Sequence, residues 1–281
     1  MDGTVIKQIR EDKNLTLEAT YFGVCSKTNA IAFEQGKRML AADKFIQVLD
    51  NLLISLDEFM WIANDHQLST QLVFEGLLKH YWNTGQLPKF EQQLQLSKKQ
   101  GLNELSLASF RLLHAYATGA DIPLAELELV ERYFAELSLW TLADLKLFAN
   151  ISCVLPFELM ENLLAEALKA KRRYRNYPQS NTLFATLLIN CLEQTFAKDR
   201  PELSQSLLEQ LSEFTAEAEE IGYRLFERYY QALYEYRYGE LKKGKEELLA
   251  VQKVARFLDA KLVLEKSEEA LNCTGPRQVD N

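Results

Sequence analysis

The chain has 281 residues, with 32 lysines and arginines against 40 aspartates and glutamates, and its net charge at pH 7 is −8. This acidic balance argues against a protein that coats nucleic acid without specificity, because such binding comes mainly from neutralised phosphates. The length predicts two domains. No segment approaches the roughly 20 apolar residues of a membrane span, and Lys7 and Arg10 precede no long apolar run, so no signal peptide is expected.

Cysteine usage favours a reduced, cytoplasmic protein. The four cysteines are far apart and form no C-x-x-C pair; they are Cys25, Cys153, Cys191 and Cys273. Cys25 lies beside a predicted recognition helix, where a partly exposed thiol could sense oxidation. The alternative is that Cys25 fills the turn as a small apolar residue.

Residues 26–36, SKTNAIAFEQG, have the pattern of the second helix of a helix-turn-helix followed by a glycine stop. Thr16 is placed to cap the short helix before it, and Ser26 to cap the second helix. Gly23 supplies the tight turn between them. Gly36 then ends the second helix, since glycine enters the left-handed conformation at little cost. The pattern predicts a DNA-binding head.

In such a head the N-terminal side chains of the second helix lie at base edges in the major groove. Lys27 and Thr28 are therefore the expected base readers, and Lys13 and Lys37 the expected phosphate contacts. The candidate DNA-binding residues are Lys13, Ser26, Lys27, Thr28, Asn29 and Lys37. The alternative is a small helical bundle with ordinary solvated lysines.

Charge limits what one head can do. Residues 1–64 hold seven lysines and arginines against nine aspartates and glutamates, a net charge of −2. One head of this charge should bind phosphates poorly. Two heads on a homodimer, reading half-sites one helical turn apart, would bind better.

Three strings in order, IKQIREDKNLTLEA, SKTNAIAFEQG and KFIQVLDNLLISLDEF, make the first 64 residues resemble the amino-terminal domain of the Rgg/GadR/MutR group of transcription regulators. The helix-turn-helix of that group is similar to the Xre/Cro class. The resemblance implies that Arg10 of the first helix pairs with Glu34. The chain departs from the group at Ala30, Ile31 and Ala32, where a large aliphatic residue, a serine and an arginine are usual. Because Ala32 lacks a guanidinium, about 1–3 kcal/mol of base discrimination is lost. Weaker or narrower DNA binding is therefore expected.

The head is expected to end near residue 64. Ser55 and Glu58 form a capping-box pattern for a helix that runs to about Asn64. Residues 65–69 then read as a linker between a helix-turn-helix domain, 1–64, and a second domain, 70–281.

From residue 70 onward, apolar residues recur at helical spacing, and turn-forming residues interrupt them at regular intervals. The breaks are Gly85 to Pro88, Gly101, Gly119 to Pro123, Pro156, Pro178 to Ser180, Pro201, Gly222 and Gly239. About ten helices of roughly 15–18 residues follow from these breaks, which is typical of an α-solenoid. Residues 239–251 resemble the turn and second helix of a tetratricopeptide repeat, without its tryptophan. The predicted fold is all-α: a helix-turn-helix head followed by a tetratricopeptide-like α-solenoid.

The family resemblance implies that this solenoid binds a short, hydrophobic, imported signalling peptide. Asn150 and Asn190 are 40 residues apart in similar surroundings, and one amide can satisfy both an N–H and a C=O of a bound backbone. Phe110 and Tyr230 share the same 40-residue phase and are candidate pocket walls. The alternatives are ordinary helix-surface asparagines and core aromatic rings.

The basic residues of segment 169–175 lie at a predicted helix C-terminus, where the helix dipole favours cations. A structural role is expected there, the alternative being attraction of an acidic partner or a peptide carboxylate. Residues 1–281 contain no catalytic motif, no metal-ligand spacing and no cofactor fingerprint. An enzyme with an unrecognised site is thus the third hypothesis. The first is a peptide-responsive, quorum-sensing type of transcription regulator that works as a homodimer. The second is a solenoid interaction protein whose degenerate head no longer binds DNA and which sequesters a protein partner.

Overall fold

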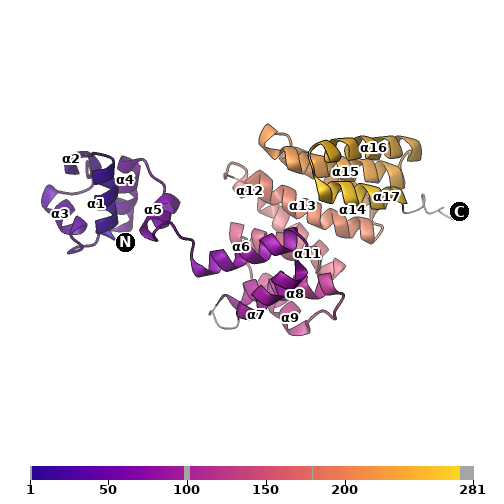
Figure 1. The fold of residues 1–281 in the computed structure, drawn as a ribbon, viewed down its shortest axis with the longest axis horizontal. Helices are drawn as coiled ribbons and strands as arrows, with labels where there is room; N and C mark the ends of the chain where they lie inside the picture. The colour runs from indigo at the N-terminus through magenta and orange to yellow at the C-terminus, as the bar shows by residue number, and fades with distance from the viewer. Residues whose placement is uncertain (1, 98–101, 179, 273–281) are drawn as a thin grey trace. The chain divides into compact units, whose positions relative to one another are not determined.

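The computed structural model describes most of the chain, namely residues 2–97, 102–178 and 180–272. Every regular element in the described ranges is a helix (Figure 1). Cys273 and the break predicted at Gly101 lie outside the described residues. Contacts between Cα atoms divide the chain into two compact units, Met1–Gln93 and Leu94–Asn281. The sequence places its boundary at the linker instead, and that boundary stays a prediction.

Short helices build the first unit. They are α1 (Gly3–Asp12), α2 (Leu17–Thr20), α3 (Lys27–Glu34), α4 (Ala42–Leu52), α5 (Leu56–Ala63), α6 (Thr70–Asn83) and the first part of α7 (Leu87–Leu96). The predicted caps at Thr16, Ser26 and Ser55 are confirmed: each side chain accepts a hydrogen bond from the backbone N–H three residues on. Gly23 and Gly36 both have the positive φ expected of them, 72° and 68°. Local chemistry therefore places α2 and α3 as the sequence predicts.

Aromatic rings fill the core of the first unit. Phe33, Phe45 and Phe59 make successive edge-to-face contacts, and each is at most 2% exposed. The backbones of α1 and α3 meet at Gly3, where an added Cβ would lie 2.0 Å from the Phe33 carbonyl oxygen. Ala30, where the family usually carries a larger residue, is fully buried. These contacts fix α3 on α1.

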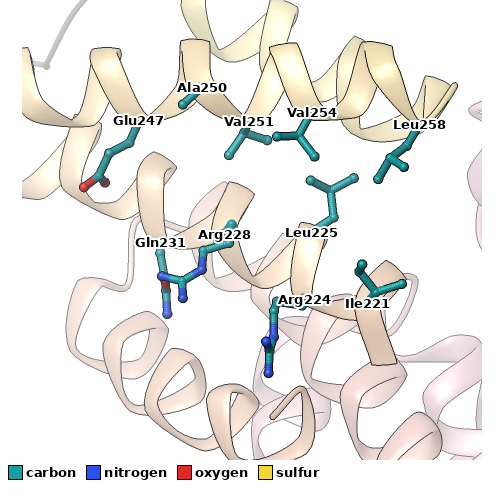
Figure 2. Close-up of a pocket in the computed structure, with 10 residues that line it drawn as sticks. All are labelled: Ile221, Arg224, Leu225, Arg228, Gln231, Glu247, Ala250, Val251, Val254 and Leu258. Carbon is teal, nitrogen blue, oxygen red and sulfur yellow. The ribbon is translucent and has the colours of Figure 1, made fainter. Parts of the chain in front are cut away.

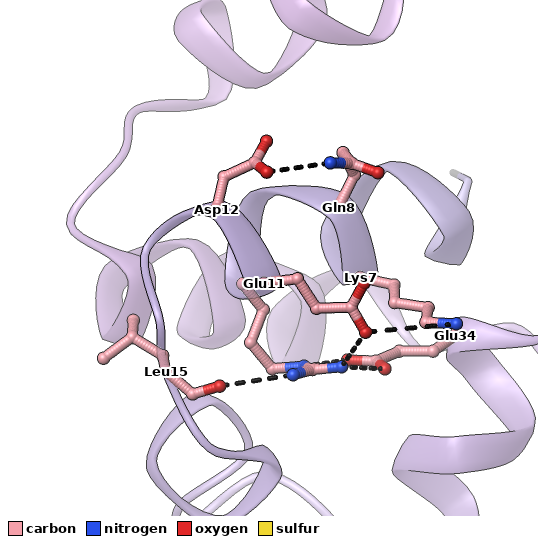
Figure 3. A network of polar contacts seen from close by, with 7 residues as sticks. Lys7, Gln8, Glu11, Asp12, Leu15 and Glu34 are labelled. Atoms are coloured by element: carbon pink, nitrogen blue, oxygen red, sulfur yellow. Dashed lines mark hydrogen bonds and ion pairs between the residues drawn. The ribbon is translucent and has the colours of Figure 1, made fainter.

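The ion pair implied between Arg10 and Glu34 is confirmed. Nε and Nη2 of Arg10 donate to the two carboxylate oxygens of Glu34, both at 2.8 Å, and Arg10 also reaches the Leu15 carbonyl (Figure 3). The side chains of the pair are only 12% and 5% exposed. Because the pair is bidentate and largely buried, it joins the end of α3 to α1 rigidly.

The second unit is a row of helical hairpins. Its elements are α8 (Glu104–Thr118), α9 (Leu124–Ala135), α10 (Leu142–Ile151), α11 (Phe157–Lys169), α12 (Lys171–Tyr174), α13 (Ser180–Ala197), α14 (Pro201–Phe214), η2 (Ala218–Glu220), α15 (Ile221–Tyr238), α16 (Leu241–Phe257) and α17 (Lys261–Asn272). The predicted α-solenoid is confirmed, although α10 has only 10 residues. The break predicted at Gly222 lies slightly earlier in the structure, between Phe214 and Ile221, and Gly222 itself lies in the first turn of α15.

Contacts between helices define two layers: a continuous row of helices, and the helices that pair with members of that row. Helices α8 with α9, α13 with α14, and α15 with α16 pack as pairs, and α8, α10, α13, α15 and α17 each contact the next to form a continuous row. The orange and yellow helices of Figure 1 show this stacking from α13 to α17. Helices α15 and α16 approach closely at Gly244, where an added Cβ would lie 2.2 Å from the Tyr236 backbone nitrogen. Among the described residues, no helix is both long enough and apolar enough to cross a membrane.

Candidate functional site

Helix α3 presents a small solvent-facing surface at its N-terminus. Lys27 and Thr28 are both exposed there, while Ala30 and Phe33 face the core. The Ser26 hydroxyl accepts the Asn29 backbone N–H and so orders the first turn. The N-terminus of a helix carries a partial positive charge that favours anions. The surface can therefore present two side chains to an anionic partner.

The other candidate DNA-binding residues of the head are of two kinds: some are exposed, and others already make hydrogen bonds within the head. Lys37 is exposed. The ammonium of Lys13 donates to the Leu52 carbonyl at 2.8 Å, so it neutralises the C-terminal end of α4. Asn29 accepts a hydrogen bond from Arg38 at 2.7 Å. The sequence reasoning missed Arg38 as a candidate, although its position just after the Gly36 stop could have indicated it.

Helix α13 carries a narrow polar stripe. Between Leu183 and Phe196, every residue is buried except three, and one turn earlier Thr182 is also partly exposed. We call these four residues the α13 stripe: Thr182, Thr186, Asn190 and Glu193. Their spacing of three or four residues places them on one face of the helix. All four are polar, so the partly exposed edge of α13 from Thr182 to Glu193 is a row of hydrogen-bonding groups.

Asn150 and Asn190 lie on neighbouring helices, α10 and α13. The amide nitrogen of Asn190 donates to the Ala149 carbonyl at 2.7 Å, and Asn150 is the next residue along, half-buried. The structure thus brings the two predicted peptide-binding positions to one helix junction. Part of the Asn190 amide already serves to join the helices.

The predicted pocket walls are core side chains. Phe110 and Tyr230 are each 2% exposed, and the Tyr230 ring stacks on Phe196 with centroids 5.6 Å apart. The expectation of open aromatic walls is corrected here, because contacts between successive helices of the row bury both rings. Only the Tyr230 hydroxyl reaches the α13 stripe, where it donates to Glu193 at 3.3 Å.

Glu193 lies where several helices converge. Its other carboxylate oxygen accepts a hydrogen bond from Lys266 of α17 at 2.6 Å, although α15 lies between α13 and α17 in the row. Burial and then the Glu193 charge raise the pKa of Tyr229 on α15. Burial, Cys153 and Glu193 raise the pKa of Tyr116 on α8.

These long-range effects indicate the shape of the row. Neighbouring helix axes lie about 8–10 Å apart, so α17 would be remote from Glu193 in a flat layer. The hydrogen bond from Lys266 to Glu193 therefore indicates that the row bends toward the α13 stripe at α17. The α13 stripe therefore lies on the side of the row toward which α17 bends.

Segment 169–175 is engaged mainly with the protein itself. Lys169 pairs with Glu166, Lys171 with Glu213, each at 2.6 Å, and Arg173 donates to the Trp140 carbonyl. These contacts give the basic run the structural role expected of a helix C-terminus.

A separate apolar hollow of about 420 Å³ lies between α15 and α16 (Figure 2). Its apolar lining comes from Ile221, Leu225, Ala250, Val251, Val254 and Leu258. Its polar lining comes from Arg224, Arg228, Gln231 and Glu247. The neighbouring Phe257 is 86% exposed. So apolar an exposed surface is unusual, and it suits a contact with another protein.

The fold and these surfaces define an all-helical repeat protein with a small helical head and a partly exposed polar stripe along α13. The family model for the C-terminal domain of the HTH-type transcriptional regulator Rgg matches residues 87–269, more than half of the chain. The chain therefore belongs to the Rgg family of HTH-type transcriptional regulators.

Solved structures share the fold along nearly the full length. A presumed transcriptional regulator from Listeria monocytogenes EGD-e matches with a TM-score of 0.79 and 22% identity, over 96% of this chain and 95% of that one. The SHP pheromone receptor Rgg2 from Streptococcus dysgalactiae gives 0.75 at 16% identity, over 96% and 98%. PrgX in complex with cCF10 gives 0.68 at 16% identity, also over 96% and 98%. At these identities the likeness establishes the fold.

Proposed function

We propose that this protein is a cytoplasmic, peptide-responsive regulator of the quorum-sensing type, which binds DNA through its head and a short hydrophobic peptide through its second unit. The observation that carries the proposal is the polar α13 stripe, in a chain of the Rgg family. Rgg2 of S. dysgalactiae is a pheromone receptor, and another compared structure is a bacterial peptide pheromone/receptor complex. Those relatives support a peptide ligand here.

In this proposal the head, residues 1–64, is a helix-turn-helix domain, and residues 65–69 link it to the peptide-binding part, 70–281. Helix α3 would enter the major groove with Lys27 and Thr28 at base edges. The buried pair of Arg10 and Glu34 supports DNA binding over the alternative of a degenerate, sequestering head, because it holds α3 rigidly. The absent guanidinium at Ala32 still favours modest affinity.

Reading two half-sites requires a homodimer, and we place its main contact on the hollow between α15 and α16. A two-fold interface needs one surface that offers both a projecting group and a recess. Phe257 is the projecting group, and the hollow beside Leu258 is the recess. Arg228 and Glu247 give the polar lining both signs of charge, which a second copy can pair. The occupant is therefore a second copy of this chain.

Substitutions in the head are expected to separate base contacts from phosphate contacts. Lys27→Ala and Thr28→Ala should change sequence preference, with a loss of about 1–3 kcal/mol for a direct base contact. Lys37→Ala should weaken binding to all sequences alike and reduce the slope of log K against log salt by about 0.9 for each phosphate that its ammonium neutralises. The measurement is fluorescence anisotropy with the DNA upstream of the chain's own gene, at several salt concentrations.

Lys169→Ala changes a lysine outside the head and should leave DNA binding unchanged. Every variant should sediment as a dimer of the 32.4 kDa chain. A folded wild-type dimer that showed no salt-dependent DNA binding would reject the DNA-binding proposal and favour the sequestering alternative.

Substitutions of the two asparagines are expected to weaken peptide binding. Asn150→Ala and Asn190→Ala should each cost about 1–3 kcal/mol, because groups of the bound peptide backbone lose their partners. The measurement is calorimetric titration with the tightest member of a pool of synthetic hydrophobic octapeptides. Asn162→Ala, on the exposed face of α11, is the matched control. Wild-type affinity in both asparagine variants would show that the peptide lies elsewhere.

A further inference from the structure

Glu193 is the only charged member of the α13 stripe. One of its carboxylate oxygens accepts a hydrogen bond from Lys266, and the other accepts one from Tyr230. The Glu193 side chain is nevertheless 44% exposed, while that of Lys266 is only 19% exposed. The carboxylate thus remains open to solvent, and the lysine that contacts it is held more deeply.

Stability gives little reason for this arrangement. A half-exposed ion pair contributes little to stability, and holding a long lysine side chain in one geometry opposes that gain. An ionised carboxylate offers about four lone-pair sites, and the hydrogen bonds from Tyr230 and Lys266 each use one of them. The carboxylate can therefore accept a further donor from the solvent side, or exchange Lys266 for one.

The geometry also keeps the carboxylate in place. Tyr230 is 2% exposed and its ring stacks on Phe196, so its hydroxyl holds one Glu193 oxygen from a rigid support. Asn190 lies one turn earlier on the same face of α13 and is fixed through the Ala149 carbonyl. An amide for the peptide backbone and a carboxylate for a cation therefore stand next to each other.

We propose that Glu193 is the anchor for a cationic nitrogen of the peptide ligand, and that Lys266 takes the place of that nitrogen when no ligand is bound. The cationic nitrogen is either the free N-terminal ammonium of the peptide or a lysine or arginine side chain. Tyr230 acts as a positioning residue. This inference rests on the proposed function, since it assigns a charge preference to the same peptide site.

The test uses the full-length protein and synthetic octapeptide pools as probes. The first pair of pools differs only in a free against an acetylated N-terminus. The second pair is acetylated and differs only in lysine against norleucine at one position. Binding is measured by fluorescence anisotropy. Wild type should prefer one cationic pool over its neutral partner by about tenfold, as expected for a charge-assisted hydrogen bond. The pair that shows the preference identifies the source of the nitrogen.

Glu193→Gln should abolish that preference, because the amide keeps the size of the side chain and can still accept the Tyr230 hydroxyl. Lys266→Met should strengthen binding of the cationic pool, since the competing ammonium is gone. Glu209→Gln, on the exposed face of α14, is the matched control and should retain the preference. Circular dichroism establishes that each variant is folded.

The outcomes separate the two proposals. If wild type binds the pools without any charge preference, or Glu193→Gln keeps the full preference, the anchor is refuted and the proposed peptide site stands. If wild type binds no pool at all, both the anchor and the proposed peptide function are refuted.

Discussion

Gly244→Ala is expected to lower the free energy of unfolding of the second unit by about 3 kcal/mol. The added methyl carbon would lie 2.2 Å from the backbone nitrogen of Tyr236 and 2.4 Å from its Cα. A backbone cannot rotate away as a side chain can, so α15 and α16 must separate along a contact that buries Leu233 and Leu248. The measurement is urea unfolding followed by circular dichroism.

Gly222→Ala is the control for this prediction. Gly222 lies in the first turn of α15, and nothing lies within 4 Å of its added methyl carbon. Alanine there should be neutral or raise the free energy of unfolding by up to about 1 kcal/mol, because alanine favours the helix. Equal stability of the two alanine variants would mean that α15 and α16 do not approach this closely in solution.

Arg10→Ala is expected to lower the free energy of unfolding of the head by about 3 kcal/mol. The substitution leaves the Glu34 carboxylate, only 5% exposed, without its bidentate partner. Adding Glu34→Ala should recover part of the loss, since no buried charge then remains unpaired. Thermal unfolding of residues 1–64 as an isolated fragment, shown first to fold, and of the full chain gives the values. A loss below about 0.5 kcal/mol would place this pair among exposed surface pairs.

Local signals make much of the head predictable. Thr16, Ser26 and Ser55 cap helices because a hydroxyl and a backbone N–H three residues apart meet whenever a helix begins, whatever surrounds them. Gly36 ends α3 for an equally local reason. The pairing of Arg10 with Glu34 is not local, and only the family resemblance points to it.

The exposed stripe of α13 is less predictable. Helical spacing identifies the apolar side of a helix, but in α13 almost every side is buried, so the spacing does not indicate which residues remain open to solvent. Spacing alone equally makes Tyr230 a candidate pocket wall, whereas the structure buries it in the core. Glu193 and Lys266 are 73 residues apart, and their contact depends on how α13, α15 and α17 pack together. The contact of Lys13 is not predictable from local sequence either, because its hydrogen bond to the Leu52 carbonyl depends on how α1 packs near α4.

The contact across α15 has a thermodynamic consequence. Lys266 belongs to α17, which packs on the helices that bear the hollow proposed for the second copy. A ligand that binds Glu193 in place of Lys266 breaks this hydrogen bond and so changes the packing of the last three helices. Coupling between two binding events is reciprocal. Peptide affinity should then vary with protein concentration, and a monomer and a dimer of this chain would respond to different levels of the same signal.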